Sequence, residues 1–139
     1  MNPQSTAPAD CPEFLLIFRN TDVEKRLPLE ELHHAMDRLH EWLDRWTERG
    51  AIQGGQPLGY QSRVISGARQ RTIADGPYAE AKEAVGGYVI VRAADLDEAA
   101  QIASEWPMLD YDAVVEVRPL LEMCAAMALV KEHMAAAPA

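Results

Sequence analysis

The sequence predicts a one-domain α+β protein in which an antiparallel sheet carries its helices on one face. Three observations lead to this prediction. An unbroken apolar run spans Phe14 to Phe18, apolar side chains recur at helical spacing between Leu29 and Arg49, and the strand-then-helix pattern returns after Gly86. A chain of 139 residues also has the usual size of one domain.

The first strand is predicted over Glu13–Arg19, because a short apolar run of this kind suits a strand covered on both faces. The first helix is predicted over Leu29–Arg49, with Pro28 at its first position and Gly50 after its end. Its apolar stripe repeats at steps of three and four: Leu32, Met36, Leu39, Leu43 and Trp46.

The middle of the chain is predicted to hold two strands, within Ala51–Tyr60 and Gln61–Ala74, with a hairpin turn near Gly67 and Ala68. A turn follows at residues 75–77, Asp-Gly-Pro. In this turn Asp can bond its own backbone, Gly relaxes φ and Pro fixes it.

The second half repeats the strand-and-helix pattern. A strand is expected over Tyr88–Arg92, and Asp95 begins a helix as its N-cap, with Glu98 completing an acidic variant of the capping box. After Pro107 ends that helix, we expect a strand over Ala113–Arg118 and a Met-rich helix over Leu121–Ala135. Without one edge strand and the last helix, the order is βαββαβ, which is the ferredoxin-like order.

Charge and composition exclude several classes of partner. The net charge of −9 argues against nucleic acid and against an anionic membrane surface as partners. No apolar run approaches the roughly 18–20 residues of a membrane-spanning helix. The polar start, Met1 to Pro12, lacks the pattern of a signal peptide, so we expect a flexible tail on a cytoplasmic protein. Cys11 and Cys124 lie far apart and form no metal-binding cluster.

One stretch carries a specific motif. Residues 75–83 read DGPYAEAKE, and GGY follows at 86–88. This pattern resembles the signature of the YCII-related, or DGPF, family, in which the fourth residue is usually Phe and is Tyr78 here. The EVRP sequence at 116–119 is similar to the end of that family's last strand.

The resemblance covers the chain from about Glu13 to Pro119. We therefore expect one YCII-like domain over residues 13–119, a C-terminal helix extension over 120–135 and a flexible tail over 1–12. The resemblance implies a ferredoxin-like fold and a dimer whose two sheets face each other. Relatives include a dehydrochlorinase of catechol-type degradation, and others occur beside alternative sigma factors. The YCII branch carries a His and an Asp in its cleft, whereas the motifs quoted above contain no His.

Asp75 is the candidate for acid–base chemistry. A carboxylate at a strand end can serve as a general acid or base, and the alternative is that its side chain only closes the turn. Lys82 lies in a charge cluster with Glu80 and Glu83. This cluster either holds an anionic substrate or forms a solvated surface.

Two further groups of polar residues have a regular spacing. Glu116 and Arg118 lie two apart on the last strand and share a face, which suits either a wet cavity or ion pairs across a dimer. Four polar residues of the first helix step by four, three and four: His33, Asp37, His40 and Asp44. A solvated face of His–Asp pairs explains this spacing better than a metal site does.

The favoured hypothesis is a dimeric cleft protein that binds or transforms a small aromatic or anionic molecule by acid–base chemistry. Asp75 is the catalytic candidate, Lys82, Glu116 and Arg118 are the substrate-binding candidates, and no cofactor or metal is implied. The alternative is a non-enzymatic ligand-sensing or accessory module linked to transcription regulation, facing a basic protein. A homodimer is expected because the predicted strands hold more apolar residues than one sheet face can contain.

Overall fold

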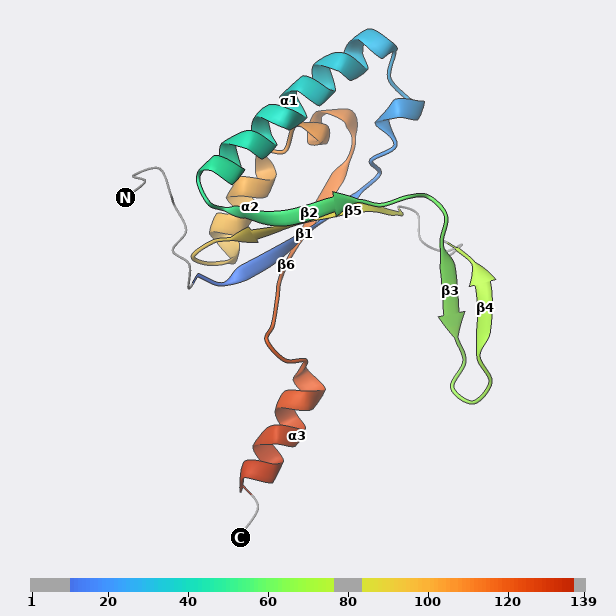
Figure 1. Cartoon of the computed structure of the whole chain (residues 1–139), viewed down its shortest axis with the longest axis vertical. Helices are drawn as coiled ribbons and strands as arrows, with labels where there is room; N and C mark the ends of the chain where they lie inside the picture. The colour runs from blue at the N-terminus through green and yellow to red at the C-terminus, as the bar shows by residue number, and fades with distance from the viewer. Residues whose placement is uncertain (1–10, 77–83, 137–139) are drawn as a thin grey trace.

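The computed structural model describes residues 11–76 and 84–136 of the chain (Figure 1). The strands and helices follow one another in the order β1 (Glu13–Arg19), η1 (Val23–Lys25), α1 (Leu29–Glu48), β2 (Ile52–Pro57), β3 (Arg63–Ser66), β4 (Thr72–Asp75), β5 (Val85–Arg92), α2 (Leu96–Ser104), η2 (Pro107–Tyr111), β6 (Val114–Pro119) and α3 (Ala125–Ala136). The labels η1 and η2 denote short 3-10 helices.

Four strands form one antiparallel sheet in the order β2-β5-β1-β6. β1 lies in the interior, where Leu16 is opposite Val89 on β5 and Val117 on β6. Its predicted span is confirmed residue for residue. The pairing of β2 with β5 contains an irregularity between Ile52 and Gly54.

The prediction of two strands between residues 51 and 74 was wrong, because this part of the chain contains three. β2 pairs with β5 until Pro57 lies opposite Gly87, close to the beginning of β5. The chain then leaves the sheet, and β3 and β4 pair in a separate two-stranded hairpin. Its turn contains Gly67, as predicted. Gly67 has a φ of +110°, a backbone conformation that favours glycine.

The helices α1 and α2 begin and end close to their predicted limits. Pro28, which was predicted to be the first helical residue, is the N-cap that precedes α1. Arg49 follows the helix as its C-cap. At the start of α2, the Asp95 side chain accepts a hydrogen bond of 2.9 Å from the backbone N–H of Glu98, so the predicted cap is confirmed.

One face of the sheet carries the hydrophobic core. Phe14, Leu16 and Phe18 alternate along β1 and are buried on that face, together with Val89 and Val91 of β5. Both α1 and α2 cover this face, as predicted, and lie above the sheet in Figure 1. The Trp42 indole N–H of α1 donates a hydrogen bond of 3.1 Å to the Ile102 carbonyl of α2, which ties the two helices together.

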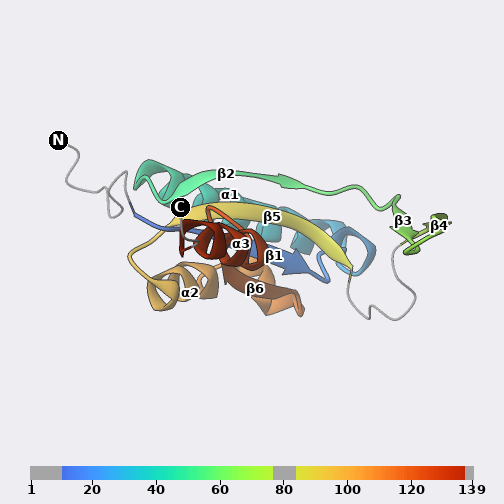
Figure 2. The ribbon, with the colours of Figure 1, turned by 90° about the horizontal axis from the view of Figure 1, so that it is seen from below.

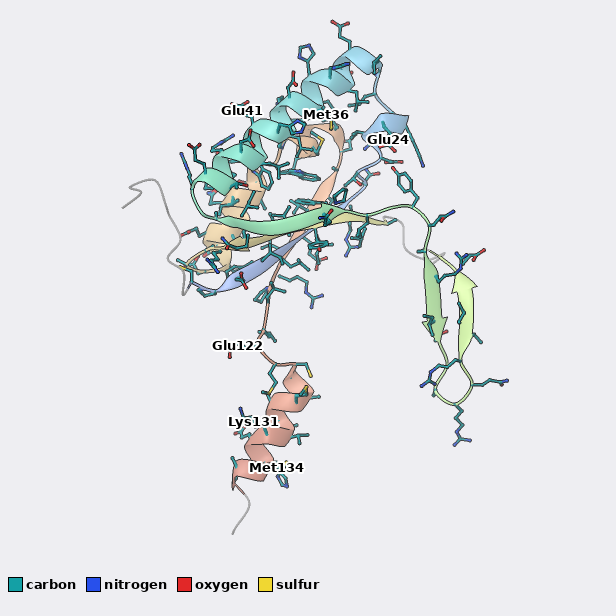
Figure 3. All side chains as sticks on the ribbon, in the orientation of Figure 1. Glu24, Met36, Glu41, Glu122, Lys131 and Met134 are labelled. Atoms are coloured by element: carbon teal, nitrogen blue, oxygen red, sulfur yellow. The ribbon has the colours of Figure 1, made fainter. Side chains whose placement is uncertain are left out.

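The last helix stands apart from this core. α3 begins at Ala125, four residues later than predicted, and none of its residues is buried. Figure 2, seen from below, shows α3 in front of the opposite face of the sheet, while Lys131 and Met134 project freely from it in Figure 3. Within residues 11–76 and 84–136, no helix has both the length and the apolar character of a membrane span.

Candidate functional site

The face of the sheet opposite α1 and α2, here called the open face, brings two predicted site residues together. Strand alternation places Glu116 and Arg118 on this face of β6, where they lie opposite Ile17 and Leu15 of β1. The prediction that they share a face is therefore consistent with the register of the two strands.

Glu116 forms an ion pair that the sequence did not reveal. The Arg19 guanidinium on β1 donates a hydrogen bond of 3.1 Å from Nη2 to the Glu116 Oε1, and both side chains are partly exposed. The two residues are 97 positions apart, so only the register of β1 against β6 brings them together. The only local signal was that Arg19 follows Ile17 at a spacing of two, which places both on one face.

The middle of the open face is apolar. Leu15 and Ile17 of β1 lie opposite Ile90 and Tyr88 of β5, and all four are half-buried in the single chain. Charged groups border this patch. The Arg19–Glu116 pair lies at one end, and at the other end the Arg92 guanidinium lies 3.8 Å from the Glu13 carboxylate.

Arg118 is the exposed cation beside this apolar patch. Among the described residues, it takes part in none of the ion pairs, which involve other arginines. Arg118 can therefore offer its guanidinium to an anion next to Leu15. A planar guanidinium binds a carboxylate through two parallel hydrogen bonds, which gives orientation as well as affinity.

Asp75 lies elsewhere, at the end of β4 in the hairpin. Its carboxylate is 3.2 Å from Nη1 of Arg63, the residue directly opposite on β3, and its side chain is 87% exposed. The following Gly76 donates its backbone N–H to the Ser62 carbonyl over 3.0 Å. A Cβ at Gly76 would meet the Ser62 hydroxyl, so a larger residue at this position requires the Ser62 side chain to turn away. Lys82 lies outside the described residues, as does most of the DGPYAEAKE motif.

A second polar cluster holds the base of the hairpin against the body. The Tyr60 hydroxyl donates a hydrogen bond to the Glu24 carboxylate of η1, and this bond raises the pKa of Tyr60 to about 12. The Lys25 ammonium lies 4.1 Å from the centre of the Tyr60 ring. Figure 3 shows Glu24 beside the connection that leads from β2 to the hairpin. Sequence reasoning missed this cluster because 36 positions separate Glu24 from Tyr60.

The polar stripe of α1 faces solvent. The side chains of His33, Asp37, His40 and Asp44 are exposed. In residues 11–76 and 84–136, no three histidines, cysteines or acids come together as metal ligands.

Comparison with family models matches the chain to a known domain. The model of the YCII-related domain matches residues 14–124, which include the four-stranded sheet, α1, α2 and the hairpin and end just before α3. No curated protein matches the chain.

Proposed function

The chain belongs to the YCII-related family, and from this premise we propose that it is a cytoplasmic, dimeric cleft protein that binds or transforms a small organic molecule by acid–base chemistry. The observation that carries this proposal is the open face, where an apolar centre is bordered by charged groups and by the exposed Arg118. A site of this composition suits a molecule with an apolar or aromatic body and a carboxylate.

The dimer supplies the second wall of the cleft. The sheet order agrees with a ferredoxin-like fold, in which helices cover one face only. Two open faces packed about a twofold axis would cover Leu15, Ile17 and Ile90 of both copies. The polar groups at the border of each face would then line the entrance to the space between the sheets.

Each candidate residue has a distinct part in this proposal. Arg118 and Lys82 bind the anionic group of the ligand, and Glu116 holds Arg19 at the border of the site. Asp75 acts as the general acid or base. It lies on the hairpin and reaches the ligand once the dimer closes the cleft.

A thermal-shift screen of small aromatic and aliphatic carboxylates tests the binding part, because a ligand that binds only the native state raises the melting temperature. We expect at least one compound to stabilise the wild type. Arg118→Gln should lose this stabilisation with an affinity loss of at least about tenfold, since hydrogen bonds to a charged group contribute about 1.5–3 kcal/mol.

Arg49→Gln is the matched control, because Arg49 stacks on Trp46 and lies on the helix side of the sheet. This variant should respond to ligand like the wild type. A wild type that no carboxylate stabilises would contradict the proposal, as would an Arg118→Gln variant with an unchanged response. With a binding compound in hand, Asp75→Asn should retain binding and lose turnover.

The exposed apolar surface of α3 favours a second candidate function, a non-enzymatic sensing or accessory module. Its exposed apolar side chains include Met127, Leu129, Val130 and Met134. A helix of this kind can carry a protein partner on its apolar side. Ligand binding that is unaffected by Asp75→Asn, without any turnover by the wild type, would favour this module over the enzyme.

A further inference from the structure

The hairpin of residues 61–76, here called the arm, lacks the support that a two-stranded sheet normally needs. Its strands have four residues each and pair with one another only. Every residue of β4 is exposed, and on β3 only Val64 is half-buried. An isolated two-stranded hairpin is marginally stable in water. The arm therefore has the properties of an element that completes its packing on another surface.

The base of the arm has a fixed direction. The Tyr60–Glu24 hydrogen bond holds it at the end of the sheet, and the bond between the Gly76 N–H and the Ser62 carbonyl closes the base of the hairpin itself. In Figure 1 the arm and α3 both extend below the sheet, on the side of the open face, and Figure 2 shows the arm beyond one end of the sheet and α3 in front of it. A molecule seated on the open face would therefore lie between the arm and α3.

The arm presents an apolar pair on one of its faces. Ile65 and Ile73 lie directly opposite each other, and they are 63% and 69% exposed. Cross-strand pairs share a face, so the two side chains form a continuous apolar surface. Thr72 and Ser66 lie on the other face of the arm, where their hydroxyls are 3.1 Å apart.

The charge of the arm is opposite to that of the remaining chain. Residues 61–76 contain three arginines, Arg63, Arg69 and Arg71, and one acid, Asp75, which gives a net charge of +2. The whole chain carries −9, so the rest of it carries −11. A basic arm is therefore complementary to the body of another copy of this chain.

We propose that the arm docks on α3 of a second copy, with Ile65 and Ile73 packed against the apolar side chains of that helix. The exposed Met127, Val130 and Met134 share one side of α3, because they recur at steps of three and four. Both surfaces are exposed in the single chain, and each has the character that the other requires. The inference rests on the dimer proposed above and assigns two of its contacts.

Sedimentation of two lysine variants tests the contact. Ile73→Lys should raise the dissociation constant of the dimer by about tenfold or more, because it places a charge within a packed apolar contact. Thr72→Lys adds the same charge at the neighbouring position on the opposite face of the arm and should leave the constant nearly unchanged. Circular dichroism should show the same folded body in both variants, because neither position contributes to the core.

Cross-linking tests the position of the contact. Cys124 is exposed immediately before α3, so a short bis-maleimide should join Ile73→Cys of one copy to Cys124 of the other in a Cys11→Ser background. Thr72→Cys should cross-link poorly, and Cys124→Ser should abolish the product. Equal cross-linking from both arm positions would overturn the inference.

Two sedimentation results would also overturn it, and they differ in what they mean for the function. If the wild type is a dimer and Ile73→Lys has the same dissociation constant, the arm contact is ruled out and the proposed dimer stands. A monomeric wild type would remove both proposals. Tight binding of a labelled DNA duplex by this monomer, lost on replacing Arg69 and Arg71 with alanine, would assign the basic arm to nucleic acid instead.

Discussion

At the scale of single residues, the hydrogen bond between Tyr60 and Glu24 leads to a prediction of how stability depends on pH. The neutral phenol donates to the carboxylate, so its ionisation costs this bond, and the pKa of Tyr60 rises from 10.0 to about 12. Because the pKa is higher in the folded state, the hydrogen bond contributes fully to the free energy of unfolding below pH 10. This contribution is lost as the pH rises through about 12.

Ultraviolet titration of the phenolate measures this effect. In Glu24→Ala the ionisation of Tyr60 should return towards its ordinary pKa, and Tyr60→Phe should remove that transition and so identify it. Glu24→Gln keeps an acceptor without the charge, so its transition should fall between those of the wild type and Glu24→Ala. Identical titration curves for the wild type and Glu24→Ala would contradict the assignment.

At the scale of secondary structure, the N-cap of α2 should contribute measurably to stability. Asp95→Ala removes the acceptor of the Glu98 N–H and should lower the free energy of unfolding by about 0.5–2 kcal/mol. Asp95→Asn retains an acceptor oxygen at the same place and should lose much less. Urea denaturation measures both variants, and equal losses in the two would show that charge rather than the hydrogen bond matters.

The strands and helices also show which parts of the fold can be predicted from sequence. β1, α1 and α2 have strong local signals, namely an apolar run, a helical stripe and an Asp cap, and these elements lie where they were predicted. The burial of α1 is shifted from its predicted stripe, because Ala35 and Trp42 are buried with Trp46 while the other four stripe residues are half-buried. The hairpin was harder to predict because β3 and β4 bury almost nothing and therefore carry little hydrophobic pattern. In the site, the shared face of Glu116 and Arg118 follows from their spacing, whereas the Arg19–Glu116 pair depends on strand register.

At the scale of the whole molecule, the open face predicts the oligomeric state. We expect the wild type to sediment as a homodimer at micromolar concentration, because an apolar patch of this kind is rarely left in water. Ile17→Lys places a charge at the middle of the patch and should give a folded monomer. Ala100→Lys, on the exposed side of α2, should remain a dimer. A wild type that sediments as a folded monomer would contradict the prediction.

The irregular pairing of β2 has a consequence for how the molecule can associate. A sheet can also grow sideways, when the unpaired backbone groups of its outermost strand accept a strand from another chain. β2 is such a strand, but it contains a register shift between Ile52 and Gly54 and ends at Pro57, which has no N–H to donate. Bulges and prolines of this kind prevent strand addition. On this side the sheet therefore resists growth into fibrils.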